Sequence, residues 1–199
     1  MMGLVRMVWL IILIPLFSLP ASGQDAMMGS ISFIYRDGQG VHSVEPDTDK
    51  LFVDEDFKIV LASFAPKYVY LIHKASDGTH QLLKSGRLDS GDIIFFPSRD
   101  DWFRLDAVSG IETFYIVYTT KREISLETAF KNPHDAKRDF LVKEGLKRLF
   151  RRDTGREKSS EIPTLISSSF RGSGDIDYQS HARYIPNEDP YIEVIGIRH

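Results

Sequence analysis

The sequence predicts a mainly β fold: an antiparallel β-sandwich or barrel-like domain with one C-terminal amphipathic helix and a final strand. Three observations predict it. Short segments rich in aromatic and β-branched residues recur between Ser30 and Thr119, with turn residues between them. The spacing of apolar residues becomes helical after Ser125. A further strand-like segment, Tyr191–Arg198, lies next to the C-terminus.

The first predicted strands are Ser30–Arg36 and Phe57–Ser63. A turn at Asp37-Gly38-Gln39-Gly40 follows the first, and the acidic stretch after this turn is predicted to be a loop. In the second strand apolar residues alternate, which places Phe57, Ile59 and Leu61 on one face. Pro66 then interrupts the pattern.

A hairpin is predicted to join Tyr68–Lys74 to a return strand at His80–Leu83. Asp77-Gly78 between strand-forming segments is a strong hairpin signal, because glycine tolerates the positive φ that such turns require. With a two-residue turn, residue 80 pairs with Ala75. His73 then lies diagonally across from His80 on the same face.

Three more strands are expected before the helical region. They are Asp92–Phe96, which Pro97 ends, Trp102–Asp106 and Glu112–Thr119. In the middle one, alternation directs Phe103 and Leu105 inward and Arg104 outward.

The helical region begins with one or two turns at Ser125–Phe130. Asp135 is predicted to be the N-cap of the main helix, Ala136–Phe150. Its apolar stripe consists of Val142, Leu146, Leu149 and Phe150, with Phe140 at the edge.

After the helix, Arg151–Gln179 is predicted to be a long polar loop with a short strand at Ile162–Ile166. Arg183–Ile185 and Tyr191–Arg198 are predicted to rejoin the sheets. The predicted organisation is a signal peptide at 1–23, an N-terminal strand and acidic loop at 24–50, a β-sandwich core at 51–122, a helical segment at 123–150, a polar loop at 151–180 and a C-terminal strand segment at 181–199.

The N-terminal segment predicts export. Arg6 is the only charged side chain before Asp25, an apolar run extends from Met7 to Phe17, and Ala21-Ser22-Gly23 has the small residues that signal peptidase accepts. We expect cleavage after Gly23. The alternative is a retained membrane anchor, but the run is shorter than the roughly 20 apolar residues of a spanning helix.

The amino-acid composition restricts the cellular compartments and the classes of partner that fit this protein. The sequence contains no cysteine, so an exported protein of this kind fits the bacterial periplasm or cell surface better than the disulfide-rich proteins that animals secrete. The net charge is −3, and twelve basic against seven acidic residues lie between Lys121 and Lys158. These charges fit a solvated helix face, or a basic surface that meets an anionic partner. The negative net charge and short basic cluster argue against nucleic acid.

From about Asp54 to Lys121 the order of features resembles a bacterial family catalogued as domain of unknown function 4384. The residues that carry the resemblance are Leu61-Ala62-Ser63, Tyr68-Val69-Tyr70-Leu71-Ile72 leading into Ser76-Asp77-Gly78, Phe96-Pro97, Phe103-Arg104-Leu105 and Gly110-Ile111-Glu112. The family often has Phe-Pro in the return strand, where this chain has Gln81-Leu82-Leu83-Lys84. The resemblance implies a small β-sandwich in exported or envelope proteins and brings no catalytic residues or cofactor.

Metal-binding patterns are incomplete in this sequence. His73 and His80 form the best pair of imidazole ligands, yet a third ligand is missing, so ordinary surface histidines explain them more simply. Acidic clusters occur at Asp54-Glu55-Asp56, at Asp47 with Asp49, and at Asp175 with Asp177. None has the spacing of a calcium loop, and solvated loops account for them.

Two groups of residues suggest other binding chemistry. Asp100-Asp101 beside Trp102 is the nearest approach to a pair of carboxylates for acid–base work, and a polar turn before a strand is the simpler interpretation. A second group has two interpretations, packing within the sheet, which is the commoner role of such residues, and an aromatic platform for a sugar or peptide: Tyr68, Tyr70, Tyr115, Tyr118 and Phe114.

The sequence therefore predicts an exported bacterial envelope protein, periplasmic or secreted, that is a non-enzymatic binding or accessory module for an envelope protein or glycan. One alternative is a divergent enzyme that acts on cell-wall or surface polymers, and another is an accessory that assembles a complex through its C-terminal helix. No catalytic, cofactor-binding or metal-ligating residue is predicted. We expect no cofactor, no nucleic acid and no stable membrane span after signal cleavage.

Overall fold

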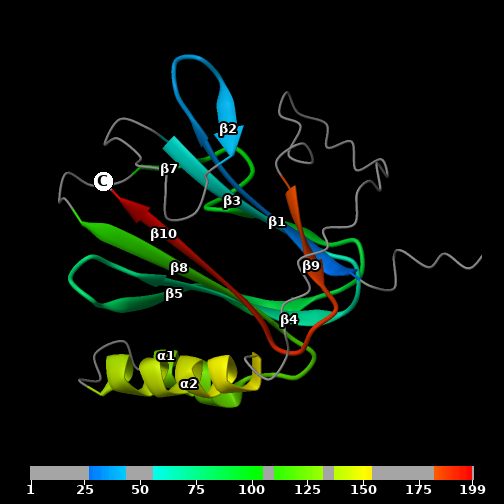
Figure 1. Cartoon of the computed structure of the whole chain (residues 1–199), viewed down its shortest axis with the longest axis vertical. Coiled ribbons are helices and arrows are strands. Elements are labelled where there is room, and N and C mark those ends of the chain that lie inside the picture. The colour runs from blue at the N-terminus through cyan, green and yellow to red at the C-terminus, as the bar shows by residue number, and fades with distance from the viewer. Residues whose placement is uncertain (1–26, 44–55, 105–109, 132–136, 154–181, 199) are drawn as a thin grey trace, which may run out of the picture.

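The chain folds as two antiparallel β-sheets packed face to face, with a helical layer on the outer face of one sheet (Figure 1). The computed structural model describes residues 27–43, 56–104, 110–131, 137–153 and 182–198. Within these residues the strands form two separate sheets, which confirms the predicted sandwich.

Sheet A has the strand order β2-β1-β3-β6, with β7 beside β3 and β9 beside β1. Its strands are β1 (Met27–Arg36), β2 (Val41–Ser43), β3 (Asp56–Ser63), β6 (Ile93–Phe96), β7 (Phe103–Arg104) and β9 (Ala182–Pro186). Sheet B has the order β10-β8-β4-β5. Its strands are β4 (Lys67–Lys74), β5 (His80–Leu88), β8 (Ile111–Thr119) and β10 (Tyr191–Arg198).

The main core lies between the two sheets. Phe57, Ile59 and Leu61 of β3 are buried in it, as the alternation of that strand predicts. Facing them, Phe114 of β8 meets both Phe57 and Phe33 edge-on, with ring centroids 5.6 and 5.5 Å apart. These aromatic side chains supply a large buried area, which is the main favourable term in holding the sheets together.

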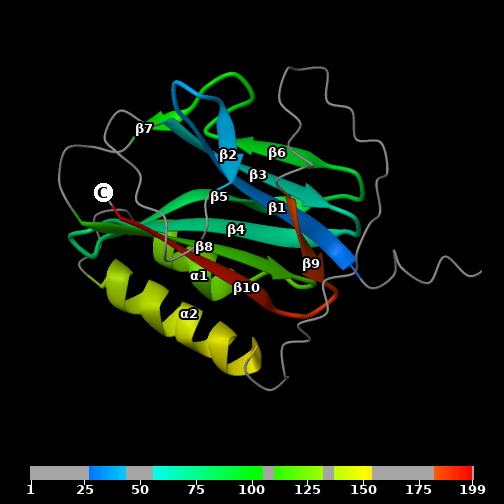
Figure 2. The same cartoon turned by 45° about the horizontal axis from the view of Figure 1, so that its top comes forward.

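A second core lies between sheet B and the helices α1 (Ile124–Lys131) and α2 (Arg138–Asp153), which Figure 2 shows side by side on that face. The central strands β4 and β8 of sheet B are consequently covered on both faces, and the middle of each is apolar or aromatic, whereas the edge strand β5 is mostly exposed. The second core is formed by Tyr70, Ile72, Val117, Leu126, Ala129, Val142, Leu146, Leu149 and Ile192.

Polar contacts fix α1 to sheet B at its first turn. The Tyr70 hydroxyl accepts a hydrogen bond from the Glu123 backbone N–H at 2.8 Å and donates one to Glu127 at 3.1 Å. Burial, together with Glu127, raises the pKa of Tyr70 to about 12, so the hydroxyl keeps the proton it donates. Arg152 of α2 donates to Glu123 at 2.6 Å, which joins α2 to the residue immediately before α1.

Two predicted details are wrong. Phe140 is 64% exposed and does not join the apolar stripe of α2, because it lies on the side of the helix opposite Val142 and Leu149. The hairpin turn is longer than two residues: the Ala75 N–H donates to the Thr79 carbonyl, and His80 pairs with Lys74 rather than with Ala75.

Several strand bounds also differ from the predictions. The return strand β5 extends to Leu88, well beyond Leu83, and β2 forms where a loop is expected. Asp135 and Ile162–Ile166 lie outside the described residues. Within the described part of the chain, no helix combines the length and apolar character that crossing a membrane requires.

Candidate functional site

His73 and His80 do not form a metal site. Because His73 pairs with Gln81 and His80 with Lys74, the two side chains point to opposite faces of sheet B. His80 is 2% exposed beneath the helices, and its backbone N–H donates to Asp139 of α2 at 3.0 Å. No cluster of three potential metal ligands occurs among the residues that the structure describes.

His73 instead lies at one end of the main core, where Nε2 shares a hydrogen bond with Glu112 Oε2. Its ring stacks on Phe114 with a centroid separation of 4.8 Å. The other carboxylate oxygen of Glu112 accepts the Ser76 N–H at 3.2 Å. Gly110 permits this arrangement, because a Cβ there would lie 2.4 Å from the Ser76 Cβ.

The aromatic side chains of the tyrosine group pack within the fold, as the simpler interpretation predicts, and do not form a platform. Tyr70 and Tyr118 are fully buried and Phe114 is 2% exposed, so none of them offers a face to a ligand. Tyr68 and Tyr115 pack against the second core beneath the helices. These side chains therefore serve packing, which is the commoner role of aromatic residues within strands.

Of the acidic clusters, only Asp56 lies among the described residues, and arginines surround it. Arg36 Nη2 lies 2.7 Å from Asp56 Oδ2, and Arg104 Nη2 lies 2.8 Å from Asp56 Oδ1. Although partial burial opposes the shift, hydrogen bonds from both arginines hold the pKa of Asp56 below its usual range. A cation is therefore not needed to balance this carboxylate. Asp47, Asp49, Asp54, Glu55, Asp175 and Asp177 lie outside the described part.

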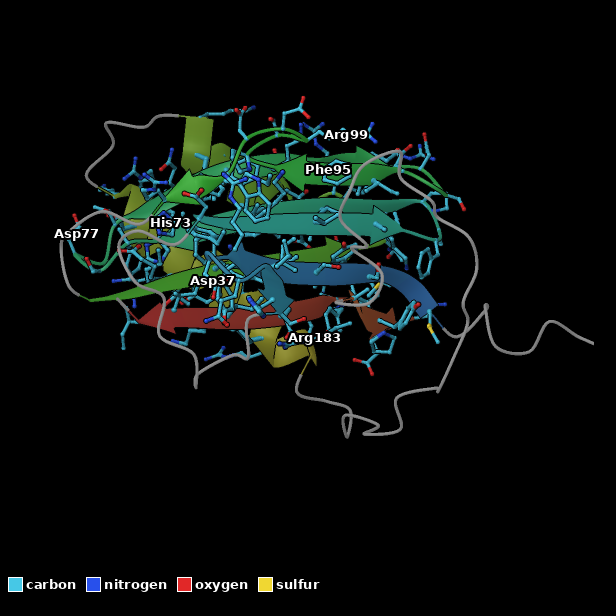
Figure 3. All side chains as sticks on the ribbon, turned by 90° about the horizontal axis from the view of Figure 1, so that it is seen from above. Asp37, His73, Asp77, Phe95, Arg99 and Arg183 are labelled. Carbon is cyan, nitrogen blue, oxygen red and sulfur yellow. The ribbon has the colours of Figure 1, made fainter. Side chains whose placement is uncertain are left out.

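The loop that carries Asp100, Asp101 and Trp102 folds over the outer face of sheet A. Within it, the Ser98 hydroxyl donates to Asp101 at 2.7 Å and accepts the Asp101 N–H at 3.1 Å. Asp100 and Asp101 are exposed, and Trp102 is partly exposed. Figure 3 shows Arg99 of this loop close to Phe95, away from His73 and Asp77 at one end of the sandwich.

Two cations hold the Trp102 indole. The Arg36 guanidinium carbon and the Lys58 Nζ each lie 4.6 Å from the ring centroid. Both distances fall within the range of cation–π attraction, and the tryptophan ring is the strongest partner for it. Both contacts stabilise the position of the indole against the outer face of sheet A.

Lys58 is the least expected member of this group, because it is only 1% exposed. Its Nζ donates to the Arg99 carbonyl at 2.5 Å, which ties the loop to β3. Burial, and then the charge of Arg36, lower the pKa of Lys58, while Asp100 and Asp101 oppose the shift. A buried lysine is uncommon, and perturbed ionisable groups concentrate at functional sites.

We call Arg36, Asp56, Lys58, Trp102 and Arg104 the Trp102 cluster. Its strands are held in register by direct pairing of Asp56 with both Arg36 and Arg104. Arg36 and Arg104 remain 47% and 63% exposed. The cluster thus presents a partly exposed aromatic ring and guanidinium donors, and the exposed carboxylates of Asp100 and Asp101 precede the ring in the same loop.

Sequence reasoning identified Trp102 with Asp100-Asp101 but missed Arg36, Lys58 and Arg104. Each of the three is a charged residue at an outward position of a predicted strand, which is an ordinary place for a charge. Their convergence depends on which strands are neighbours, and local pattern does not encode that.

Comparison of the chain with protein-family models, with curated proteins and with solved structures gave no match. The resemblance to the unknown-function family therefore stays a prediction.

Proposed function

We propose that this chain is a non-enzymatic binding module of the bacterial cell envelope and that the Trp102 cluster holds an envelope glycan. The observation that carries the proposal is the partly exposed indole of Trp102, fixed by Arg36 and Lys58 and bordered by exposed Asp100 and Asp101. The C–H face of a sugar stacks on an aromatic ring. Its hydroxyls pair with carboxylates and guanidinium groups placed around that ring.

The predicted signal peptide at 1–23 supports the envelope as the compartment. Cell fractionation of a C-terminally tagged copy tests this expectation directly. We expect the protein in the periplasmic or medium fraction with a mass reduced by the first 23 residues. An unprocessed protein in the cytoplasmic fraction would refute export.

Binding at Trp102 can be measured without a label. The sequence contains only two tryptophans, and Trp9 lies within the segment expected to be removed. We expect soluble peptidoglycan fragments to change the Trp102 emission saturably. Trp102→Ala should weaken retention on insoluble peptidoglycan at least tenfold, or about 1.4 kcal/mol, because it removes the central aromatic contact.

Matched variants distinguish the loss of aromatic stacking from a general loss of folded structure. Trp102→Phe keeps an aromatic face and should retain most of the binding. Lys84→Ala changes an exposed residue of β5, on the other sheet, and should leave binding unchanged. Equal retention of the wild type and Trp102→Ala on peptidoglycan would contradict the proposal.

A second candidate function, an enzyme acting on envelope polymers, rests on the His73–Glu112 hydrogen bond. A carboxylate that orients an imidazole is a common element of acid–base catalysis. If the protein releases new fragments from peptidoglycan and His73→Ala abolishes that release, the enzymatic function replaces the binding function. If chromatography detects no new fragments, the hydrogen-bonded pair of His73 and Glu112 has a structural role.

A further inference from the structure

The helix α2 has a solvent-facing side that is separate from the Trp102 cluster. Val142, Leu146 and Leu149 bury one side of α2 against sheet B. Gly145 lies against α1, where a Cβ would come within 2.7 Å of Leu126 Cδ2. The opposite side, outermost in Figure 2, faces solvent.

That outer side is cationic. Its basic residues, all exposed, are Lys143, Lys147, Arg148 and Arg151. Lys143, Lys147 and Arg151 follow one another at intervals of four and so form a stripe along the helix. The only acid among them, Glu144, lies 3.7 Å from Lys147. With six basic and three acidic residues, α2 carries a net charge of +3 in a chain whose net charge is −3.

Two apolar side chains accompany these cations. Phe140 is 64% exposed and Leu141 is 42% exposed, both in the first turn of α2. Seven and eleven residues separate Phe140 from Lys147 and Arg151, which places all three on the same side of the helix. An exposed aromatic residue beside a stripe of cations is typical of helices that lie at a membrane surface.

We propose that the outer side of α2 binds the surface of an anionic lipid bilayer, with the cations on the lipid headgroups and Phe140 and Leu141 in the interfacial region. This goes beyond glycan binding and rests on different residues. The cations extend about 12 Å along the helix from Lys143 to Arg151 and do not converge on one point. That geometry fits an extended charged surface better than a single small anion, and a bilayer also accommodates the apolar side chains.

The experiment is co-sedimentation of the purified protein with vesicles. We expect binding to an equal mixture of phosphatidylglycerol and phosphatidylcholine, little binding to phosphatidylcholine alone, and loss of binding as salt screens the charges. Lys147→Glu should weaken vesicle binding by about an order of magnitude or more, since each unit of charge near an anionic surface contributes about fivefold. Phe140→Ser should weaken it several-fold.

Each variant has a matched control. Lys84→Glu makes the same change of charge on β5 and should leave the vesicle affinity within about twofold. Ile111→Ser removes another apolar side chain, 52% exposed at the start of β8, and should have no effect. All four positions are exposed, so unchanged circular dichroism is expected and verifies folding in each variant.

Three outcomes would overturn the inference. One is equal binding to anionic and neutral vesicles. Another is equal weakening by Lys147→Glu and Lys84→Glu, which would show that total charge rather than this face is sensed. The third is binding to soluble polyglutamate with no binding to vesicles, which would indicate an acidic protein as the partner.

Discussion

Lys58 illustrates how a single side chain organises the Trp102 cluster. Burying an ammonium group is costly unless hydrogen bonds and nearby negative charge compensate for the lost hydration. Here the Arg99 carbonyl and the indole face provide that compensation. The same contacts attach the loop to β3, so the charge of Lys58 is expected to matter more for positioning Trp102 than for stability.

The variant Lys58→Met separates these two contributions. Methionine retains an unbranched apolar side chain and removes the charge, so we expect the free energy of unfolding to change by less than about 1 kcal/mol. Without the hydrogen bond to Arg99, the loop should loosen and acrylamide should quench Trp102 more efficiently. Urea denaturation and quenching measure the two effects separately. Unchanged quenching would show that Lys58 does not hold the loop.

His80 should make stability depend on pH. Burial lowers the pKa of His80, although the hydrogen bond to Asp139 opposes the shift. The unfolded chain therefore binds a proton at His80 at a higher pH than the folded chain does. Stability contributed by the neutral imidazole is present above the usual histidine pKa of about 6.5 and is lost as the pH falls below it.

The measurement compares wild type with His80→Gln in urea between pH 7.5 and 5.5, a range chosen to lie above most carboxylate titrations. The wild type should lose stability with a slope of at most about 1.4 kcal/mol per pH unit from this group. The variant should show a shallower slope, because the other histidines remain in both proteins. Parallel slopes would mean that His80 is protonated equally easily in both states.

At the scale of elements, Gly29 shows how closely the strands of sheet A approach one another. A Cβ at Gly29 would lie 2.3 Å from the carbonyl oxygen of Ala62 in the neighbouring strand β3. That oxygen belongs to the backbone, so it cannot move without disturbing the pairing of β1 with β3. We expect Gly29→Ala to destabilise the fold by about 2 kcal/mol or more.

Gly38→Ala is the matched control for this prediction. Gly38 lies in the turn between β1 and β2, and a Cβ there would meet no atom within 4 Å. Its effect should stay within about 0.5 kcal/mol, as for most surface substitutions. Thermal or urea unfolding of both variants checks the pair. Similar losses in the two variants would show that the contact with Ala62 is not the cause.

The sequence predicted correctly those strands and helices in which the spacing of apolar residues follows from burial of one face. In β3, alternation placed Phe57 and Lys58 on opposite faces, which is confirmed, but it did not predict that Lys58 is buried on its face as well. The assignment of Phe140 to the stripe of α2 was wrong on the helical period itself, because 3.6 residues per turn place Phe140 opposite Val142 and Leu149.

The errors in the site have a different physical cause. The face of sheet B on which His80 lies depends on the length of the turn between β4 and β5. A change of one residue in register moves a side chain to the opposite face. The Trp102 cluster depends on the pairing of Asp56 with Arg36 and Arg104, residues 20 and 48 positions away. Pairing at such separations is a property of the folded sheet, and no short segment of sequence predicts it.

At the scale of the whole molecule, sheet B joins the two cores. Residues of β4 alternate between them: Val69 and Leu71 face the main core, whereas Tyr70 and Ile72 face the helices. The helical layer and sheet A therefore pack against opposite faces of the same strands. We expect the protein to unfold as one cooperative unit, since neither layer can be lost without exposing one face of sheet B.

Leu149→Ala tests this cooperativity. Leu149 is 1% exposed in α2, and its truncation should cost about 2–5 kcal/mol. Trp102 contacts Arg36 of β1 and Lys58 of β3 on the outer face of sheet A, on the far side of the sandwich from α2. If the molecule unfolds as one unit, the variant should show the same decrease in the urea midpoint measured by Trp102 fluorescence and in the midpoint measured by far-ultraviolet circular dichroism. A lowered dichroism midpoint with an unchanged Trp102 midpoint would show instead that the helices unfold separately while the sandwich persists.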